Sequence, residues 1–207
     1  MTASYLIHPL TTFVCGAILS CGVLLWWVSG AAERNRSEAF VKEYKQALVK
    51  VPVAAWDANS PEETVAVERF KEFLRKVGDV RFVSENARKV YSDDAFLDDT
   101  LVVHHGAAAI EKYFLKTATT VSAFKVQIDD VSRSGSNYYV RWTMEFAAPA
   151  LSGGELVHSV GISQIRFNPE GKVAFHQDFW DSGKNFYAHL PVVGGVIGLI
   201  RRRLQIE

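Results

Sequence analysis

The sequence predicts an α+β domain that follows a single transmembrane helix. Residues 1–32 contain no charged side chain, segments between residues 61 and 118 have apolar residues every three or four positions, and apolar residues alternate between 123 and 180. The first feature is typical of a membrane span, the second of helices and the third of strands. Helices followed by a run of strands predict an antiparallel sheet with the helices on one side. A chain of 207 residues is long enough for one such domain and an appendage.

The composition excludes several classes of protein. Lys and Arg number 23, Asp and Glu also number 23, and no basic excess appears after residue 60, so no nucleic-acid partner is expected. Hydrophobic residues make up 48% of the chain, which excludes a disordered protein. Both cysteines, Cys15 and Cys21, lie in the N-terminal apolar run. The rest of the chain therefore has no disulfide framework, zinc-finger pattern or cysteine nucleophile.

Residues 1–32 are predicted to form a membrane anchor. The apolar run from Thr11 to Val28, with its flanking residues, reaches the roughly 20 residues that a bilayer requires. Trp26 and Trp27 end this run, where indole rings favour the interface and contact membrane lipid. A cleaved signal peptide is the alternative, because residues 29–32 are small. However, no basic residue precedes the run, and the run is longer than the usual apolar region of about 7 to 15 residues.

Basic residues follow the predicted anchor and none precedes it. Arg34, Arg36 and Lys42 are the first of them. By the positive-inside rule, the chain is a single-pass membrane protein whose C-terminal domain lies on the cytoplasmic or organellar matrix side.

The region after the anchor is predicted to contain a juxtamembrane helix and linker over residues 33–60, followed by helices that open the domain 61–185. Ser60, Pro61 and two acidic residues are typical of a helix start, so a helix is expected from 61 to about 77. Further helices are expected at 79–89 and at 106 to about 117, where Tyr113 faces inward. Four strands are expected at 123–132, 138–147, 155–167 and 172–180, joined by turns rich in Gly, Asn and Pro.

Two pairs of motifs resemble SnoaL-like members of the nuclear transport factor 2-like superfamily. Residues 90–99 (VYSDDAFLDD) and 106–114 (GAAAIEKYF) are similar to the start of these domains, and residues 165–173 (IRFNPEGKV) and 176–181 (HQDFWD) to their last hairpin. The resemblance covers about residues 61 to 181 and implies a cystatin-like cone, in which a curved antiparallel sheet wraps around the N-terminal helices and encloses a pocket. It also implies a homodimer formed through the outer face of the sheet. One departure is visible, because the usual Asp-Pro is Asp98-Asp99 here.

One face of the last predicted strand carries His176, Asp178 and Trp180, because successive side chains of a strand point to opposite sides. If this face lines the cone, Asp178 is a candidate general acid or base with His176 as its partner, and Asp98 or His104 lies across the mouth. The resemblance allows this chemistry, since enzymes of this fold such as ketosteroid isomerase and polyketide cyclases use a pocket carboxylate for proton transfer. The alternative is that Asp178 and His176 satisfy one another and have a structural role.

The candidate ligand-binding residues are aromatic or lie near the expected pocket: Trp142, Phe146, Trp180, Tyr113 and His104. Alternating aromatic residues such as Trp142 and Phe146 also suit the wall of any one-sided sheet. The histidines are scattered or adjacent and lack the spacing of metal ligands, so no metal site is expected. No nucleotide-binding glycine motif is present, and no cofactor is expected.

The C-terminal tail, residues 186–207, is predicted to be amphipathic. An uncharged run from Leu190 to Ile200 is too short to span a bilayer and is followed at once by Arg201, Arg202 and Arg203. A helix here could lie in the membrane interface with its arginines near anionic headgroups. Alternatively, the tail packs on its own domain or closes the mouth of the cone.

These observations predict a membrane-anchored domain whose role is non-catalytic: it binds a hydrophobic small molecule or acts as a scaffold at the membrane. One alternative is an isomerase, cyclase or hydratase that uses a pocket carboxylate on a hydrophobic substrate. Another is an accessory subunit of a larger membrane complex. A hollow pocket with a desolvated carboxylate would favour the enzyme, and a filled cone would favour the subunit.

Overall fold

The computed structural model describes residues 37–190 and 192–204 of the chain, which divides into two units, residues 1–49 and 50–207. The predicted anchor, with Trp26 and Trp27, lies outside the described residues. Within the described ranges, no helix has the length and apolar character that crossing a membrane requires. A helix occupies residues 37–50, and the rings of Phe40 and Tyr44, one helical turn apart, have centroids 6.4 Å apart.

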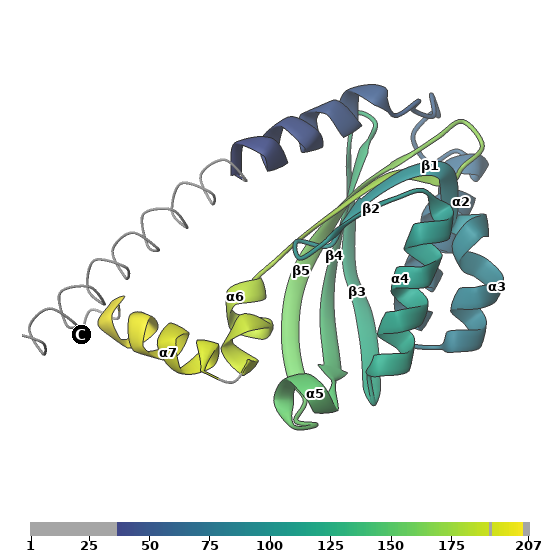
Figure 1. The fold of residues 1–207 in the computed structure, drawn as a ribbon. Coiled ribbons are helices and arrows are strands. Elements are labelled where there is room, and N and C mark those ends of the chain that lie inside the picture. Colours follow the sequence, from purple (N-terminus) through teal and green to yellow (C-terminus); the bar gives the residue numbers. More distant parts are fainter. Residues whose placement is uncertain (1–36, 191, 205–207) are drawn as a thin grey trace, which may run out of the picture. The chain divides into compact units, whose positions relative to one another are not determined.

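The second unit begins with helices that are interrupted by two strands, continues with four further strands and ends in a short helical tail (Figure 1). Its elements are α2 (Pro61–Lys76), α3 (Val80–Val90), β1 (Tyr91–Asp98), β2 (Val103–His105), α4 (Ala107–Thr120), β3 (Ala123–Ser134), β4 (Asn137–Ala147), α5 (Pro149–Ser152), β5 (Val157–Phe167), β6 (Val173–Trp180), α6 (Ser182–Asn185), the 3-10 helix η1 (Tyr187–His189) and α7 (Val193–Leu204). The three predicted helices and the four predicted strands all occur, with ends within three residues of those expected.

The six strands form one open, curved sheet in the order β2-β1-β6-β5-β4-β3. In Figure 1, α2, α3 and α4 lie together on one face of this sheet. Neighbouring strands are antiparallel except β1 and β6, which pair in parallel. The prediction of an α+β fold with a curved sheet is confirmed. The prediction of a purely antiparallel four-stranded sheet is wrong, because β1 and β2 extend the sheet beyond β6.

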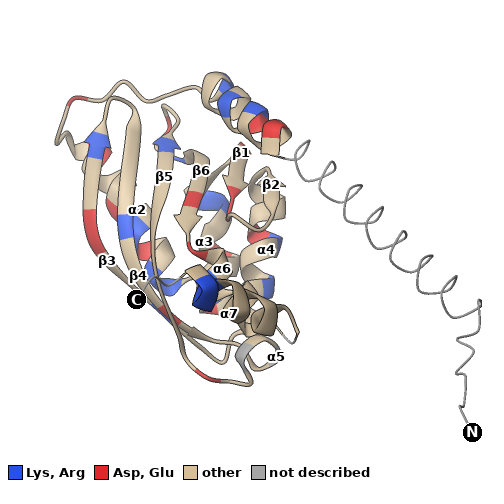
Figure 2. Cartoon of the chain, turned by 90° about the vertical axis from the view of Figure 1, so that its left-hand side faces the viewer, with Lys and Arg blue, Asp and Glu red and all other residues tan. Residues whose placement is uncertain are grey.

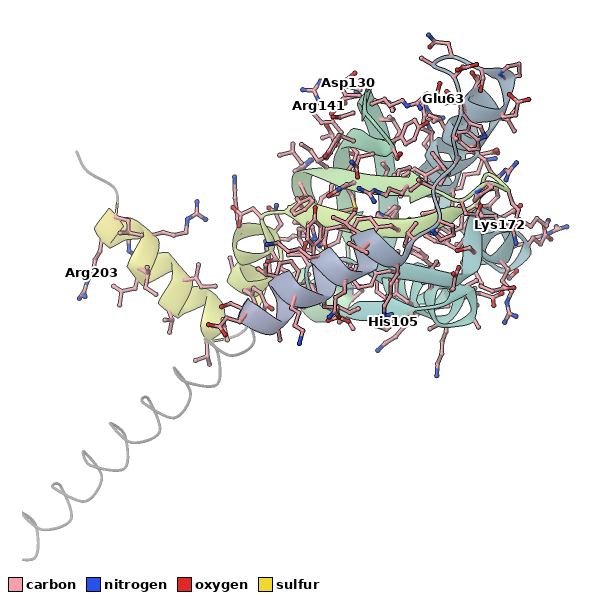
Figure 3. The ribbon with its side chains drawn as sticks, turned by 90° about the horizontal axis from the view of Figure 1, so that it is seen from above. Glu63, His105, Asp130, Arg141, Lys172 and Arg203 are labelled. Atoms are coloured by element: carbon pink, nitrogen blue, oxygen red, sulfur yellow. The ribbon has the colours of Figure 1, made fainter. Side chains whose placement is uncertain are left out.

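Local sequence explains where α2 begins. The Ser60 side chain accepts a hydrogen bond from the Glu63 backbone N–H, and Pro61 occupies the first helical turn, where a missing N–H costs nothing. The Glu63 side chain accepts in turn from the backbone N–H of Asn59, the residue before the N-cap, which resembles a capping box shifted by one residue. The same carboxylate reaches Arg133 and Tyr138, each at 2.7 Å, and so ties the start of α2 to strands β3 and β4. Figure 3 shows Glu63 at this end of the domain.

Aromatic side chains of the helices fill one half of the cone. Phe70 and Phe73 of α2 are fully buried, and the Phe73 ring packs edge-on against Tyr91 of β1 and Phe114 of α4. Phe70 packs edge-on against His176 of β6, with ring centroids 5.2 Å apart. This cluster fixes α2 and α4 on the sheet and leaves the other half of the cone hollow.

Candidate functional site

The hollow half of the cone is a cavity of about 840 Å³ between α4, the sheet and the segment after β6. Its wall is mainly apolar, with Val126, Met144 and Phe146 among the residues from the sheet. We call its exposed edge the mouth, formed by Lys112, Lys116, Thr120 and the half-buried Leu190. A cavity of this size and lining suits a small apolar molecule.

All five residues expected from the sequence to contact a ligand line this cavity: Trp142, Phe146, Trp180, Tyr113 and His104. Asp178 also lines it, whereas His176 lies one layer behind and is fully buried. The structure therefore gathers most of the expected site residues around one cavity. Their roles in binding or catalysis remain predictions.

The Asp178 carboxylate is held at one oxygen only. Its Oδ1 atom is 2.9 Å from Nε2 of His176 and accepts a hydrogen bond from Oγ of Ser163. The side chain is 19% exposed, and its Oδ2 atom has no hydrogen bond within the described residues. One oxygen of this carboxylate is thus available to a molecule in the cavity.

The bonds to Asp178 are the end of a longer hydrogen-bonded chain, which we call the Asp178 network: Tyr91, His176, Asp178, Ser163 and Trp142. Tyr91 lies 2.9 Å from Nδ1 of His176, and Nε1 of Trp142 donates to Oγ of Ser163 at 3.0 Å. With Asp178 ionised and His176 neutral, every bond has one donor and one acceptor, and all donors lead to the carboxylate. This arrangement fixes the orientation of the Asp178 carboxylate in an apolar wall.

Tyr91 keeps its proton in this arrangement. Burial raises the pKa of the Tyr91 hydroxyl well above its usual value, and the negative charge of Asp178 raises it further. The ring also stacks against His176, with centroids 6.1 Å apart and planes 11° apart. Because an ionised Asp178 can only accept, the imidazole proton lies on Nε2, and Nδ1 then accepts from the Tyr91 hydroxyl.

A second carboxylate, that of Asp99, also lines the cavity but has its acceptors occupied. Its Oδ1 accepts from the backbone N–H of Leu101 and Val102, and its Oδ2 accepts from the Tyr113 hydroxyl. The Asp99 carbonyl oxygen accepts from Nε1 of Trp180 at 2.7 Å. Burial and the nearby Asp99 charge raise the pKa of Tyr113 well above its usual value. Asp99 thus fixes the loop between β1 and β2 and orients two aromatic residues of the wall.

Asp98 does not line the cavity, contrary to its expected place across the mouth. In the parallel register, Leu97 is opposite His176 and Asp98 is opposite Gln177, so the Asp98 side chain points to the other face of the sheet. Burial raises the pKa of Asp98, although a hydrogen bond from the Thr100 backbone N–H opposes this. Asp99, one residue later, takes the position at the cavity.

His104 carries an unsatisfied buried atom at the cavity wall. Its ring centroid lies 4.5 Å from that of Tyr113, and its Nε2 atom is buried without a hydrogen-bond partner. A buried polar atom without a partner is uncommon in proteins. His104 is therefore a polar group that a bound molecule could satisfy.

Sequence reasoning missed Ser163, Tyr91 and Asp99. Ser163 could have been found from the predicted hairpin, since the turn at 168–171 aligns the two strands so that Ser163 is opposite Asp178. Tyr91 lies in one of the motifs that resemble the family, but β1 was not predicted.

Among the described residues, no three His, Cys, Asp or Glu side chains gather closely enough to hold a metal ion.

A curved sheet that encloses a cavity against three helices defines the cone-shaped class of α+β domain. The chain belongs to the SnoaL-like domain family, whose family model matches residues 67–176, more than half of the chain. Membership in this family supports a fold of the ligand-binding type or of the isomerase and cyclase type.

Solved structures with the same fold are distant in sequence. An LEH-like epoxide hydrolase of M. tuberculosis has a TM-score of 0.52 and 17% identity, over 69% of this chain and 99% of its own. A protein from Catenulispora acidiphila with a ketosteroid isomerase-like fold, in complex with trimethylamine, has a TM-score of 0.50 and 12% identity, over 59% of this chain and 91% of its own. These similarities concern the fold alone. No curated protein matches the sequence significantly.

Proposed function

We propose that the domain binds an apolar small molecule in the cavity of the cone. The observation that carries this proposal is a mainly apolar cavity of about 840 Å³ with a few polar groups, among them Asp178 and His104, at its wall. Apolar walls supply affinity through burial, and isolated polar groups orient the ligand. An accessory subunit would be expected to have a filled cone, so we place ligand binding first.

The charged side chains at the mouth and in the cavity indicate which charge the ligand carries. Lys112 and Lys116 are exposed at the edge of the cavity, one helical turn apart, and neither has an ion pair within the described residues. The carboxylates of Asp99 and Asp178 line the cavity itself. A ligand with an apolar body and a neutral or anionic outer end fits this distribution of charge.

We further propose that residues 1–32 anchor this domain to a membrane, with the domain on the cytoplasmic or organellar matrix side. The absence of charge in this segment and the basic residues that follow it support the proposal. An anchored domain would meet apolar ligands that dissolve in the bilayer.

Native mass spectrometry of the full chain in a mild detergent tests ligand binding, with oleic acid and progesterone as apolar probes of different shape. Ala109 lines the cavity, whereas the neighbouring Ala108 is exposed. We expect Ala109→Trp to weaken binding of the preferred probe at least about tenfold, because the indole fills part of the cavity. The matched control Ala108→Trp should bind like the wild type. Equal binding by both variants, or no binding by the wild type, would contradict the proposal.

A second candidate function is proton transfer by Asp178. The Asp178 network fixes one carboxylate oxygen and leaves Oδ2 without a partner in the described part of the chain. In such a step, a carbon–hydrogen bond next to a ligand carbonyl breaks, the proton moves to Oδ2, and the electron pair moves onto the carbonyl oxygen. Return of the proton to another carbon would isomerise the ligand. His176 would act as a positioning residue.

Deuterium uptake from heavy water into bound progesterone tests this second function, because progesterone has hydrogens next to its carbonyl groups. We expect Asp178→Asn to abolish uptake while probe binding and the unfolding midpoint remain close to those of the wild type. His176→Asn should shift the pH dependence of uptake as well as lower its rate. Uptake that survives Asp178→Asn would remove Asp178 from this role without affecting the binding proposal.

A further inference from the structure

We propose that α7 docks on an anionic membrane surface and places the mouth of the cavity next to the lipid. The docking does not depend on which molecule the cavity holds. Transfer of a ligand from the bilayer into the cavity, which would follow from it, does depend on the proposed function.

The apolar side of α7 is largely exposed within the described part of the chain. No residue of this 12-residue helix is buried. Its exposed large apolar side chains are Val193 (42% exposed), Val196 (53%), Leu199 (47%), Ile200 (51%) and Leu204 (74%). Most of them recur at three- and four-residue steps, which places them along one side of the helix. The start of the tail packs at the cavity through Phe186 and Leu190, whereas these apolar side chains of α7 stay exposed.

The charge on α7 indicates what covers this side. Arg201, Arg202 and Arg203 are consecutive and exposed, and no ion pair involves them within the described residues. The sequence from 182 to 204 contains no Asp or Glu. Figure 2 shows the basic end of α7, and in Figure 3 Arg203 projects away from the sheet. An exposed apolar stripe with uncompensated arginines is complementary to an anionic bilayer surface.

A short segment links α7 to the wall of the cavity. Phe186 and Leu190 line the cavity, and the Leu190 carbonyl accepts a hydrogen bond from the Gly194 N–H at 2.9 Å. A Cβ atom at Gly194 would lie 2.1 Å from the carbonyl oxygen of Ala188, so α7 begins in close contact with η1. Contact of α7 with a bilayer would therefore bring lipid close to Leu190 at the mouth.

A second copy of the chain fits the exposed side of α7 less well than an anionic bilayer does. Two α7 helices packed side by side in parallel would bring six arginines together, and residues 182–204 contain no acidic side chain to pair with them. A bilayer that contains anionic lipid buries the same apolar side chains and supplies the opposite charge. Long arginine side chains can also reach the headgroups while their stems stay in apolar surroundings.

Hydrogen exchange of the full chain in nanodiscs tests the proposal. We compare discs of phosphatidylcholine alone with discs that also contain phosphatidylglycerol, and follow the amide protons of residues 193–204. We expect slower exchange of α7 in the anionic discs. Replacing Arg201, Arg202 and Arg203 by Gln should remove most of this difference. Each arginine contributes about fivefold to binding near an anionic surface, so the three together contribute about 100-fold.

A second variant tests the apolar side. In the double variant Val196→Ser with Ile200→Ser, the amide protons of α7 should no longer exchange more slowly in anionic discs. The control is the double variant Val65→Ser with Val80→Ser, which changes two similarly exposed valines on α2 and α3. Its α7 amide protons should still exchange more slowly in anionic discs. Equal exchange of α7 in anionic discs, neutral discs and detergent would overturn the proposal. Protection that needs no lipid and grows with protein concentration would also overturn it, and would identify a second copy as the partner.

Discussion

The indole ring of Trp142 lies across Gly161, its partner in the neighbouring strand β5. A Cβ atom on Gly161 would be 2.4 Å from the ring. The missing side chain therefore makes room for Trp142 at the cavity wall, where its Nε1 donates to Ser163. Position 161 thus controls the placement of one end of the Asp178 network.

Gly161→Ala is expected to displace Trp142 and break its bond to Ser163. Overpacking of this kind costs about 1 to 3 kcal/mol of unfolding free energy, which urea denaturation measures. Probe binding in the cavity should weaken as well, because Trp142 forms part of its wall. Gly195→Ala is the control, since a Cβ there would meet no atom within 4 Å. Wild-type stability and binding in Gly161→Ala would contradict this account of Trp142.

Tyr91→Phe should destabilise the domain although it removes only one oxygen atom. The buried Nδ1 of His176 would lose its hydrogen-bond donor, and an unsatisfied buried polar group costs about 1 to 3 kcal/mol. Urea denaturation measures the loss, and ¹⁵N NMR of the imidazole shows whether the proton moves from Nε2. Tyr139→Phe, which changes an exposed tyrosine of β4, should have little effect. If Tyr91→Phe changes neither the free energy of unfolding nor the position of the imidazole proton, the hydroxyl does not hold the tautomer.

Glu63 is expected to make stability depend on pH in the acidic range. Burial acts to raise the pKa of Glu63, but hydrogen bonds from Tyr138 and Asn59 and the charge of Arg133 outweigh it and hold the pKa below its ordinary value of 4.5. A carboxyl group with a lowered folded-state pKa stabilises the fold above its unfolded pKa, and this contribution disappears as the pH falls through the folded pKa.

The test for Glu63 is the unfolding free energy of Glu63→Gln at neutral and acidic pH. At neutral pH the variant should lose about 1 to 3 kcal/mol, because Arg133 loses its charged partner. As the pH falls below 4.5, the difference from the wild type should shrink. Glu62→Gln, an exposed neighbour in the same turn, serves as the control. A difference that stays constant with pH would show that the charge of Glu63 does not contribute.

The outer face of the sheet is expected to form a homodimer. Val160 is 68% exposed, and Ile162 and Phe179, which are neighbours in the β5–β6 register, are 39% and 46% exposed. Val160→Glu should weaken the dimer at least about tenfold, because it buries an unpaired charge at the interface. Analytical ultracentrifugation in a mild detergent measures this change, with Val65→Glu on α2 as the control. A wild-type chain that stays monomeric at high concentration would disprove this interface.

The regular elements could be predicted because each has a clear local signal. Ser60 and Pro61 start α2, and Asn168 at the last turn accepts from the backbone N–H of Glu170 and Lys172, which closes the β5–β6 hairpin. β1 gave no such signal. Its burial does not alternate, since it has a break in register between Tyr91 and Phe96 and is covered on both faces over its second half. Strand periodicity fails in such a segment.

The candidate site was predictable where side-chain alternation decides the geometry. Asp178 and Trp180 share the cavity face of β6, as expected from their spacing. Asp98 was misplaced because the choice between Asp98 and Asp99 depends on the parallel register of β1 with β6, which links residues far apart in the sequence. Ser163 and Tyr91 join the network through the same kind of distant pairing.

The parallel pairing of β1 with β6 also has a consequence for biosynthesis. Tyr91 and His176 are 85 positions apart, so their hydrogen bond forms only after almost the whole domain has left the ribosome. Closing so long a loop is slow, and until it closes the edge of β1 that faces β6 has no partner. Nascent chains that end before Val173 are therefore expected to need a chaperone.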